Sequence, residues 1–400
     1  MAAACRMLGR FAESDEPFIV EVDTRSGRVM AVRAARPGAG ADAGGPQCVF
    51  CPPLVDGQVN GAFGLDLQDD ALREEDVLEI SRRLARSGVG CWLPTLVTAP
   101  LHAMEHRCRV IARAAALQTP DDGARIGGIH LEGPFISPED GARGAHPAAH
   151  VLSPSLRDLR RLLRAGEGRV RCVTLAPERP GAGRLIRLLA AEGVVVSLGH
   201  HLAAPAEVFA AADAGATLCT HLGNGLPAMI PRHDNPLWAQ LADPRLAVSV
   251  IPDLFHLPPH VLEVVFRVKG RRGTLLVSDA VNLAGMPEGE YSLFGQAVEK
   301  RCDGKVALKG TDYLAGSGLM LLEGVMRTVR RTRIPLAAAL ACAAAVPAAI
   351  LGLRCPPWRP VPGRAAHFLL VDPEKSQKAR TPDSFLRAAF LGGRMVTAPH

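Results

Sequence analysis

The sequence predicts a (β/α)8 barrel of the TIM type with a small flanking β-sandwich domain built from both chain termini. Two observations lead to this fold class. From about residue 50 onward, short apolar strands alternate with helical stretches, which is typical of βα units around a parallel sheet. Strand signals without helices between them lie at both ends of the chain. We therefore expect residues 1–52 and 354–400 to form the β domain and residues 53–353 to form the barrel.

The composition allows one large buried core and limits the partners. Hydrophobic residues make up 48% of the 400 residues, enough for a single α/β barrel. The net charge is +6, but the arginines are scattered and no basic stripe is interleaved with aromatic residues, so we expect no nucleic-acid partner. Cys91, Cys172 and Cys219 fall in apolar strand-like runs, which is typical of free buried thiols and predicts a cytoplasmic protein.

The terminal segments carry β-structure signals. Residues 11–33 alternate apolar and polar positions around the turn Thr24-Arg25-Ser26-Gly27, which predicts a hairpin. Residues 35–46 are rich in Gly, Pro and Ala and predict a loop. Near the other end, residues 366–372 and 390–396 have the pattern of strands.

Eight apolar runs predict the barrel strands: residues 53–60, 91–98, 126–132, 170–176, 194–200, 216–221, 246–253 and 274–279. Helical stretches lie between them, among them residues 74–86, 99–116, 156–164 and 204–214. Residues 336–353 are apolar and long enough to raise the question of a membrane span. Because this stretch is Ala-rich and contains Pro347, we expect a buried helix and no membrane association.

Four of these strands end on Glu132, His200, His221 and Asp279, side chains that can bind a metal ion or carry a proton. The C-terminal ends of barrel strands meet at the active-site face, so the four side chains are expected to converge. A carboxylate with two imidazoles is typical of a catalytic metal site that keeps one position open for water. The sequence therefore predicts Glu132, His200 and His221 as metal ligands and Asp279 as the catalytic base and acid.

Other polar residues near the strand ends are candidates for substrate binding. His256 follows the seventh strand, where it could polarise a carbonyl group or hold substrate. A phosphate group needs backbone N–H groups in a turn or an arginine fork. Asn224 and Gly225 would supply the turn, since glycine lets the backbone approach closely, and Arg232 would supply the fork. The alternative that Arg232 lies in a solvated loop stays open.

Six motifs in a fixed order resemble a known family. They are His130-Leu-Glu-Gly-Pro-Phe-Ile, Gly144-Ala-His-Pro, Ser197-Leu-Gly-His, Thr220-His-Leu-Gly-Asn, Val277-Ser-Asp-Ala and Leu314-Ala-Gly-Ser. With them, the chain resembles the N-acetylglucosamine-6-phosphate deacetylase family of the amidohydrolase superfamily from about residue 53 to 353. The resemblance implies metal-dependent removal of acetate from N-acetyl-D-glucosamine 6-phosphate, which leaves D-glucosamine 6-phosphate, in amino-sugar catabolism.

The resemblance also implies roles for single residues. It matches Glu132, His200 and His221 to the family's zinc ligands and Asp279 to its catalytic acid and base. Substrate contacts are implied for His146, Asn224, Arg232, His256 and Ser317. The resemblance further implies a small amino-sugar phosphate as the ligand, and a homodimer in which the partner lends a residue to the phosphate pocket.

Two departures from the family's pattern affect the prediction. Many amidohydrolases carry His-x-His at the end of the first strand and bind two metal ions, whereas this chain has Gln58-Val59-Asn60. These side chains are poor zinc ligands, so we expect one divalent metal ion per chain, Zn²⁺. The loop at residues 225–236 also differs, which leaves the sugar and its 6-substituent open. Two rival functions remain: an amidohydrolase acting on a different N-acyl sugar or cyclic amide, and a catalytically silent barrel used for binding.

Overall fold

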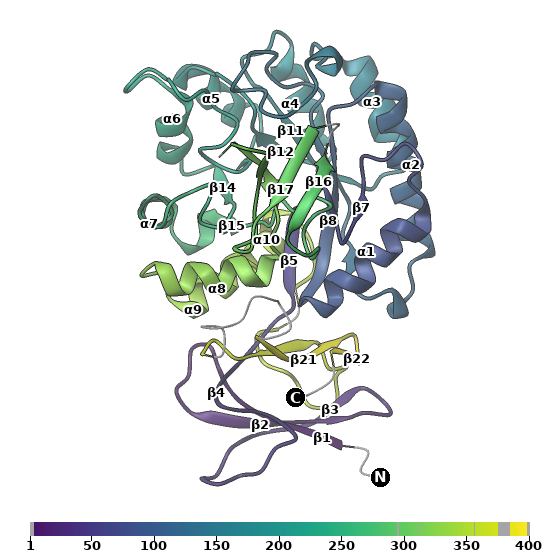
Figure 1. Cartoon of the computed structure of the whole chain (residues 1–400), viewed down its shortest axis with the longest axis vertical. Coiled ribbons are helices and arrows are strands. Elements are labelled where there is room, and N and C mark those ends of the chain that lie inside the picture. The colour runs from purple at the N-terminus through teal and green to yellow at the C-terminus, as the bar shows by residue number, and fades with distance from the viewer. Residues whose placement is uncertain (1–3, 294–295, 312, 356, 375–384, 398–400) are drawn as a thin grey trace.

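The computed structural model describes residues 4–293, 296–311, 313–355, 357–374 and 385–397. It has two parts (Figure 1): a barrel surrounded by helices, and a β domain at the bottom of the view that holds strands from both ends of the chain. The predicted fold class is therefore confirmed. The domain boundaries at residues 52 and 353 agree with these two parts but stay a prediction.

All eight predicted barrel strands are present, and they form one parallel sheet in chain order. Their bounds are β5 (Leu54–Val59), β8 (Val89–Val97), β10 (Ile129–Glu132), β11 (Val170–Leu175), β12 (Val195–Leu198), β13 (Leu218–Cys219), β14 (Ala247–Val250) and β15 (Thr274–Leu276). Shorter strands are β6 (Gly61–Ala62), which pairs with β7 (Leu65–Asp66), and β9 (Arg125–Ile126), which pairs with β8. The segment after β15 closes the barrel onto β5. Asp279 N donates to Gln58 O at 3.0 Å, and Asn60 N donates to Ala280 O at 2.7 Å.

Helices cover the outside of the barrel (Figure 1). Their bounds are α1 (Glu74–Arg86), α2 (Leu101–Leu117), α3 (Leu156–Ala165), α4 (Ala182–Ala191), α5 (Pro205–Asp213), α6 (Pro236–Ala242), α7 (Pro259–Lys269), α8 (Leu321–Arg331), α9 (Leu336–Cys342) and α10 (Ala345–Ile350). The prediction of one helix over residues 336–353 is wrong in detail, because Ala344 takes non-helical backbone angles and separates α9 from α10. Within the described residues, none of the helices has both the length and the apolar character that crossing a membrane requires.

Helix α1 illustrates how the sequence specifies these elements. Its first turn is acidic and its last turn basic, which complements the helix dipole. Val77, Ile80 and Leu84 recur at helical spacing and are buried against the barrel. Burying each of these side chains stabilises the fold by about 1.5–3 kcal/mol. Ser81 on the same face accepts a hydrogen bond from Trp92 Nε1 at 2.9 Å, which ties α1 to β8.

The strands of the β domain are hydrogen-bonded in the order β22-β21-β20-β4-β1-β2-β3 and enclose a core of their own that includes Met7, Phe50 and Phe368. Its strands are β1 (Ala4–Phe11), β2 (Pro17–Asp23), β3 (Arg28–Ala34), β4 (Ala43–Cys51), β20 (Phe368–Val371), β21 (Leu386–Leu391) and β22 (Arg394–Thr397). The predicted hairpin is confirmed as β2 and β3. The predicted loop over residues 35–46 is wrong at its end, because Ala43 and Gly44 already pair with β1.

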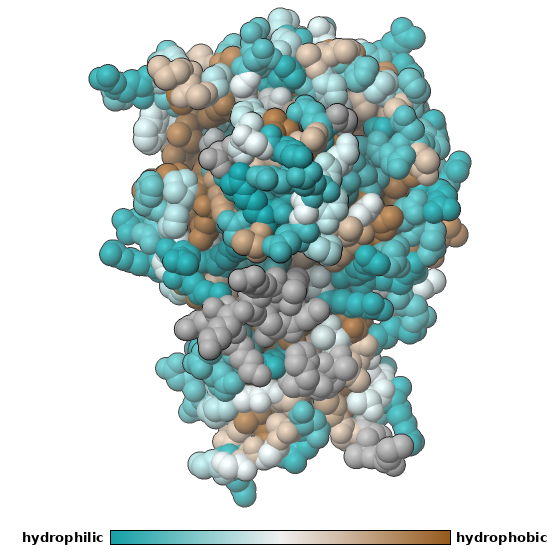
Figure 2. Space-filling view, viewed as in Figure 1, coloured by the Kyte–Doolittle hydropathy of each residue, from teal (hydrophilic) through white to brown (hydrophobic). Residues whose placement is uncertain are grey.

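A four-stranded antiparallel sheet between β15 and α8 was not predicted. It comprises β16 (Gly289–Leu293), β17 (Gln296–Lys300), β18 (Lys305–Leu308) and β19 (Leu314–Ser317). Its buried side, with Val298 and Val306, packs on Val281 and Leu283, which follow Asp279 in the chain. Its outer side is largely hydrophilic, at the centre of the upper part of Figure 2. This small sheet therefore adjoins the C-terminal end of the barrel, where the site lies.

Candidate metal centre and active site

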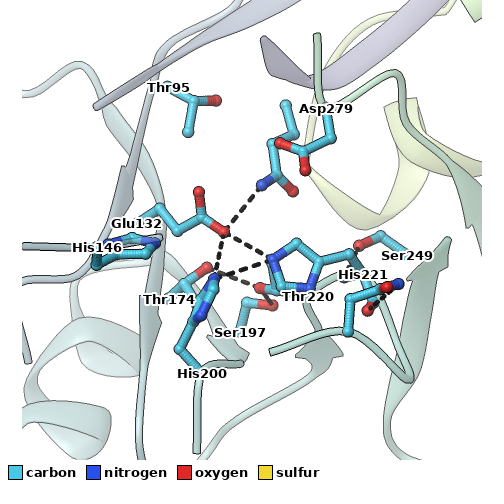
Figure 3. Close-up of polar contacts among 12 residues, drawn as sticks. Thr95, Glu132, His146, Thr174, Ser197, His200, Thr220, His221, Ser249 and Asp279 are labelled. Carbon is cyan, nitrogen blue, oxygen red and sulfur yellow. Dashed lines mark hydrogen bonds and ion pairs between the residues drawn. The ribbon is translucent and has the colours of Figure 1, made fainter. Parts of the chain in front are cut away.

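Side chains from the ends of three barrel strands meet in the interior. Glu132 is the last residue of β10, and His200 and His221 follow β12 and β13. Glu132 Oε1 lies 3.2 Å from His200 Nε2 and 2.9 Å from His221 Nε2, and the two Nε2 atoms are 3.1 Å apart (Figure 3). All three residues are buried. The structure thus brings together the three residues predicted as metal ligands.

The hydrogen bonds around this cluster test whether it fits a cation. His200 Nδ1 lies 3.0 Å from the carbonyl oxygen of Ala142, which can only accept, so Nδ1 carries the hydrogen. His200 Nε2 then presents a lone pair toward Glu132 Oε1. Two acceptor atoms at that distance are stable only with a cation or a proton between them. The Glu132, His200 and His221 donor set therefore fits a divalent metal ion.

The electrostatics of Glu132 agree with this fit. Burial by itself would raise the pKa of the Glu132 carboxyl, but the close approach of the His200 and His221 rings outweighs it and holds the pKa well below its ordinary value. Glu132 is therefore a carboxylate at neutral pH, as a metal ligand must be.

The backbone at the site is strained. His200, His221 and Asp279 have φ angles of 53°, 28° and 49°, in the region that residues other than glycine rarely adopt. Such conformations cost about 1–3 kcal/mol each and persist where the surrounding structure fixes them. Each marks the point where the chain leaves a barrel strand, so the turn aims the side chain inward.

Two amides, one on β5 and one directly after it, hold the acidic groups of the site. Gln58 Nε2 donates to Glu132 Oε1 at 2.9 Å, and Asn60 Nδ2 donates to Asp279 Oδ1 at 2.7 Å. The sequence reasoning treated Gln58 and Asn60 only as poor ligands and missed these contacts. The signal was their alternate spacing on one strand, which places both side chains on the barrel's inner face.

Asp279 lies next to the cluster. Burial raises the pKa of the Asp279 carboxyl, and the negative charge of Glu132 raises it further. Oδ1 accepts from Asn60, whereas Oδ2 has no hydrogen-bond partner among the described residues. A partly buried carboxyl with a raised pKa and one free oxygen is suited to accepting and returning a proton.

His146 packs against the ligand His200, with ring centroids 4.3 Å apart. Its Nδ1 accepts from the backbone N–H of Thr98 at 3.3 Å and lies 2.9 Å from Thr98 Oγ1. Burial lowers the pKa of His146 to about 3, so the ring is neutral. With Nδ1 as the acceptor, Nε2 carries the hydrogen and is a donor.

Buried hydroxyl groups support the cluster from inside the barrel (Figure 3). His130 Nε2 lies 2.8 Å from Thr174 Oγ1, which lies 2.7 Å from Thr220 Oγ1. Ser249 Oγ accepts from the backbone N–H of His221 at 2.7 Å. These bonds join β10, β11, β13 and β14 close to the candidate ligands and were not predicted.

A cavity of about 310 Å³ opens beside the cluster. The three candidate ligands, Asp279 and His146 line it, together with Asn60, Thr98, Arg107, His150, Ala315 and Gly316 among others. The cavity is thus bounded by the barrel mouth, by the start of α2 and by the last strand of the small sheet.

The other predicted substrate contacts lie around this cavity rather than in its walls. Asn224 Nδ2 donates to the carbonyl oxygen of His221 at 3.2 Å, and Gly225 packs against the His200 ring. His256 Nδ1 lies 2.7 Å from Asp253 Oδ2.

Ser317 N donates to the carbonyl oxygen of Asp279 at 3.3 Å, which fixes the end of β19 to the site. Arg232 is exposed on the loop before α6, and the structure does not bring its side chain into the cavity.

No protein-family model matches the chain. It is similar to N-acetylgalactosamine-6-phosphate deacetylase of Escherichia coli O157:H7, with 35% identity over 325 residues that cover 81% of this chain and 84% of that protein. It is also similar to human N-acetylglucosamine-6-phosphate deacetylase, with 36% identity over 368 residues that cover 87% of this chain and 83% of the human protein.

Solved structures give the same result. N-acetyl-D-glucosamine-6-phosphate deacetylase from Mycobacterium smegmatis, solved as a mutant in complex with N-acetyl-D-glucosamine-6-phosphate, is similar with a TM-score of 0.82 and 28% identity. The match covers 99% of this chain and 100% of that one. N-acetylglucosamine-6-phosphate deacetylase from Thermotoga maritima is similar with a TM-score of 0.77 and 26% identity, over 98% of both chains.

Proposed function

The chain belongs to the N-acetylglucosamine-6-phosphate deacetylase family of the amidohydrolase superfamily, and on that premise we propose that it converts N-acetyl-D-glucosamine 6-phosphate to D-glucosamine 6-phosphate and acetate in amino-sugar catabolism. The observation that carries this proposal is the buried cluster of Glu132, His200 and His221 beside Asp279 in one cavity. The galactosamine isomer is a second candidate substrate, because the relative from E. coli is named for it.

We propose that Glu132, His200 and His221 hold one Zn²⁺ ion. When bound there, the ion would polarise the amide carbonyl and make a water molecule nucleophilic near neutral pH. In this proposal the Oδ2 atom of Asp279 takes the proton from the attacking water and delivers it to the leaving amine nitrogen. Asn60 holds Oδ1, so the carboxyl keeps one orientation while its proton moves.

His146 would orient the sugar. Its Nε2–H group is a neutral donor, and a sugar hydroxyl is a suitable acceptor. Thr98 fixes the tautomer that leaves this hydrogen on Nε2. The cavity's small volume would exclude most water once the sugar is bound, which strengthens each of these polar contacts.

We propose that the phosphate binds at the rim formed by Asn224, Gly225, Arg232 and His256. Because Arg232 is exposed on its own loop, its contribution is proposed to occur in a homodimer, where a partner covers that loop. Met229 and Trp238 on the same side of the molecule are exposed by 89% and 51%, which supports an interface there. We also propose a cytoplasmic location, where buried free thiols such as Cys172 stay reduced.

An acetate-release assay tests the function. We expect the zinc-loaded protein to deacetylate N-acetylglucosamine 6-phosphate much faster than N-acetylglucosamine, and N-acetylgalactosamine 6-phosphate decides between the two isomers. Arg232→Ala should raise KM for the phosphorylated sugar about ten- to hundredfold and leave the unphosphorylated sugar nearly unchanged. Equal effects on both sugars would remove Arg232 from the site. Turnover of a cyclic amide with no acetate release from any sugar would refute the proposed function.

A further inference from the structure

Arg107 lies on the buried face of its helix, among residues of the core. It lies on α2 in register with Ala103, Met104 and Ile111, all of which are buried. At this i−4, i−3 and i+4 spacing the face of a surface helix is apolar. Arg107 is nevertheless only 5% exposed. A guanidinium in such a place is unusual unless it binds something, because burying an unpaired charge is costly.

The contacts of Arg107 within the chain leave most of its donors free. Nη2 donates to Asp70 Oδ1 at 2.9 Å, but the Asp70 side chain is 89% exposed. This is the one hydrogen bond of the Arg107 side chain among the described residues, although a guanidinium has five N–H donors. Its Nε is fully buried with no partner. Burial raises the pKa of the Asp66 carboxyl, and the positive charge of Arg107 offsets part of this rise, but no ion pair joins the two residues.

Arg107 lines the cavity, where its free N–H donors can reach a bound ligand. Arg107 lines the same cavity as the metal cluster and Asp279, and so does His150, whose side chain has no hydrogen-bond partner among the described residues. The cavity wall therefore presents a buried guanidinium from α2 and an imidazole from the segment that follows His146. No carboxylate of the α2 segment lines that wall.

We infer that Arg107, with His150 in the same cavity wall, forms an anion subsite in the active-site cavity that binds an acidic group of the substrate. That group is either a carboxylate on a sugar whose phosphate lies at the rim, or the phosphate itself in place of Arg232. The inference rests on the proposed deacetylase function and deepens it. It places a specificity-determining cation inside the cavity of each chain, separate from the exposed Arg232. Phosphate and carboxylate groups both offer two neighbouring oxygen atoms, and an arginine fork binds such a pair with two parallel hydrogen bonds.

The alternative is that Arg107 has a purely structural role. A substitution of its partner Asp70 distinguishes this role from anion binding. If Arg107 served only to hold the loop before α1, Asp70→Asn would have the same effect as removing the guanidinium. An ion pair with so exposed a partner contributes little, so we expect Asp70→Asn to change KM by less than about threefold.

The experiment compares wild type, Arg107→Met, Arg107→Lys and Asp70→Asn, each loaded with zinc. Methionine keeps an apolar stem and removes the guanidinium, and lysine keeps the charge without the fork. Three substrates are used: N-acetylglucosamine 6-phosphate, N-acetylmuramic acid with its carboxylate on a ring substituent, and neutral N-acetylglucosamine. We expect Arg107→Met to raise KM about ten- to hundredfold for one anionic sugar, with kcat little changed and the neutral sugar unaffected.

The affected sugar identifies the group that the subsite binds. Calorimetric titration with glucosamine 6-phosphate and with muramic acid measures the same contact without turnover. Loss of binding in Arg107→Met supports the subsite even if wild type releases no acetate, an outcome that would refute only the proposed function. An equal change of KM for all three sugars, binding that Arg107→Met leaves intact, or the same losses in Asp70→Asn would overturn the inference.

Discussion

Gly225 is the residue through which a single methyl group should disturb the metal centre. It has a φ of 64° and lies against the ring of His200. A Cβ at Gly225 would lie 2.9 Å from His200 Nδ1 and 3.2 Å from Cε1. The ring cannot yield freely, because Nδ1 is also bonded to the carbonyl oxygen of Ala142 at 3.0 Å. Gly225→Ala should therefore displace His200 from the position in which Nε2 faces the metal.

Gly225→Ala has two separate effects, one on stability and one on metal affinity. The first is the cost of placing alanine at a positive φ, about 1–2 kcal/mol. The second is the loss of the orienting contact of a ligand histidine, which typically lowers metal affinity about 10–100-fold. Gly193→Ala isolates the first effect, because Gly193 has a φ of 71° and a Cβ there would meet nothing within 4 Å.

The assay is competition for zinc with a chelator of known affinity, together with denaturant unfolding of the metal-free proteins. Both variants should lose a similar free energy of unfolding in the absence of metal. Gly225→Ala alone should bind zinc about 10–100-fold more weakly. Zinc affinity of Gly225→Ala within twofold of wild type would refute the reasoning, and so would an equal loss in Gly193→Ala.

Three further predictions follow from the site. Asp279→Asn should keep its metal and lose about 10²–10⁴-fold in kcat, since the amide cannot accept the proton; a variant within a few-fold of wild type would exclude Asp279 as the proton carrier. Because Gln58 and Asn60 donate to acids, elemental analysis should find one metal ion per active chain, and two full equivalents would contradict this. Burial raises the pKa of Asp56 from 3.8 to about 7, so ionising it opposes folding, and stability should fall as pH rises from about 4 to 7. Asp56→Asn should remove about 2–3 kcal/mol of that fall between pH 5 and pH 8, measured as free energy of unfolding; equal pH dependence in both proteins would show that Asp56 is not the cause.

The barrel could be predicted because its strands are buried on both sides. Such strands appear as continuous apolar runs, and all six residues of β5 are in fact buried. The small sheet β16–β19 escaped prediction because its strands are short and half exposed. β16, for example, has Gly289, Glu290 and Ser292 on the surface. A strand that packs only a few side chains gives no clear alternation to detect.

The candidate site shows a similar division. Glu132, His200, His221 and Asp279 could be placed because the C-terminal ends of barrel strands converge by geometry alone. Contacts made by loops and helices could not be placed from the sequence, since they depend on how close each segment comes to the mouth of the barrel. Arg107 shows the difference: the sequence analysis did not single it out, because only the fold shows that α2 faces the cavity.

The continuous sheet of the β domain bears on how the chain is made. β4 is flanked by β1, synthesised before it, and by β20, synthesised after the whole barrel. Until β20 emerges from the ribosome, the outer edge of β4 has unpaired backbone groups, and Phe50 lacks the ring of Phe368 that later packs on it. The barrel segment lies between β4 and β20 in the chain, so the folding of the barrel brings the two strands together. A substitution that slows folding of the barrel would therefore prolong the exposure of an unpaired strand edge in the β domain. That edge could pair with another chain, although it lies far from the substituted residue.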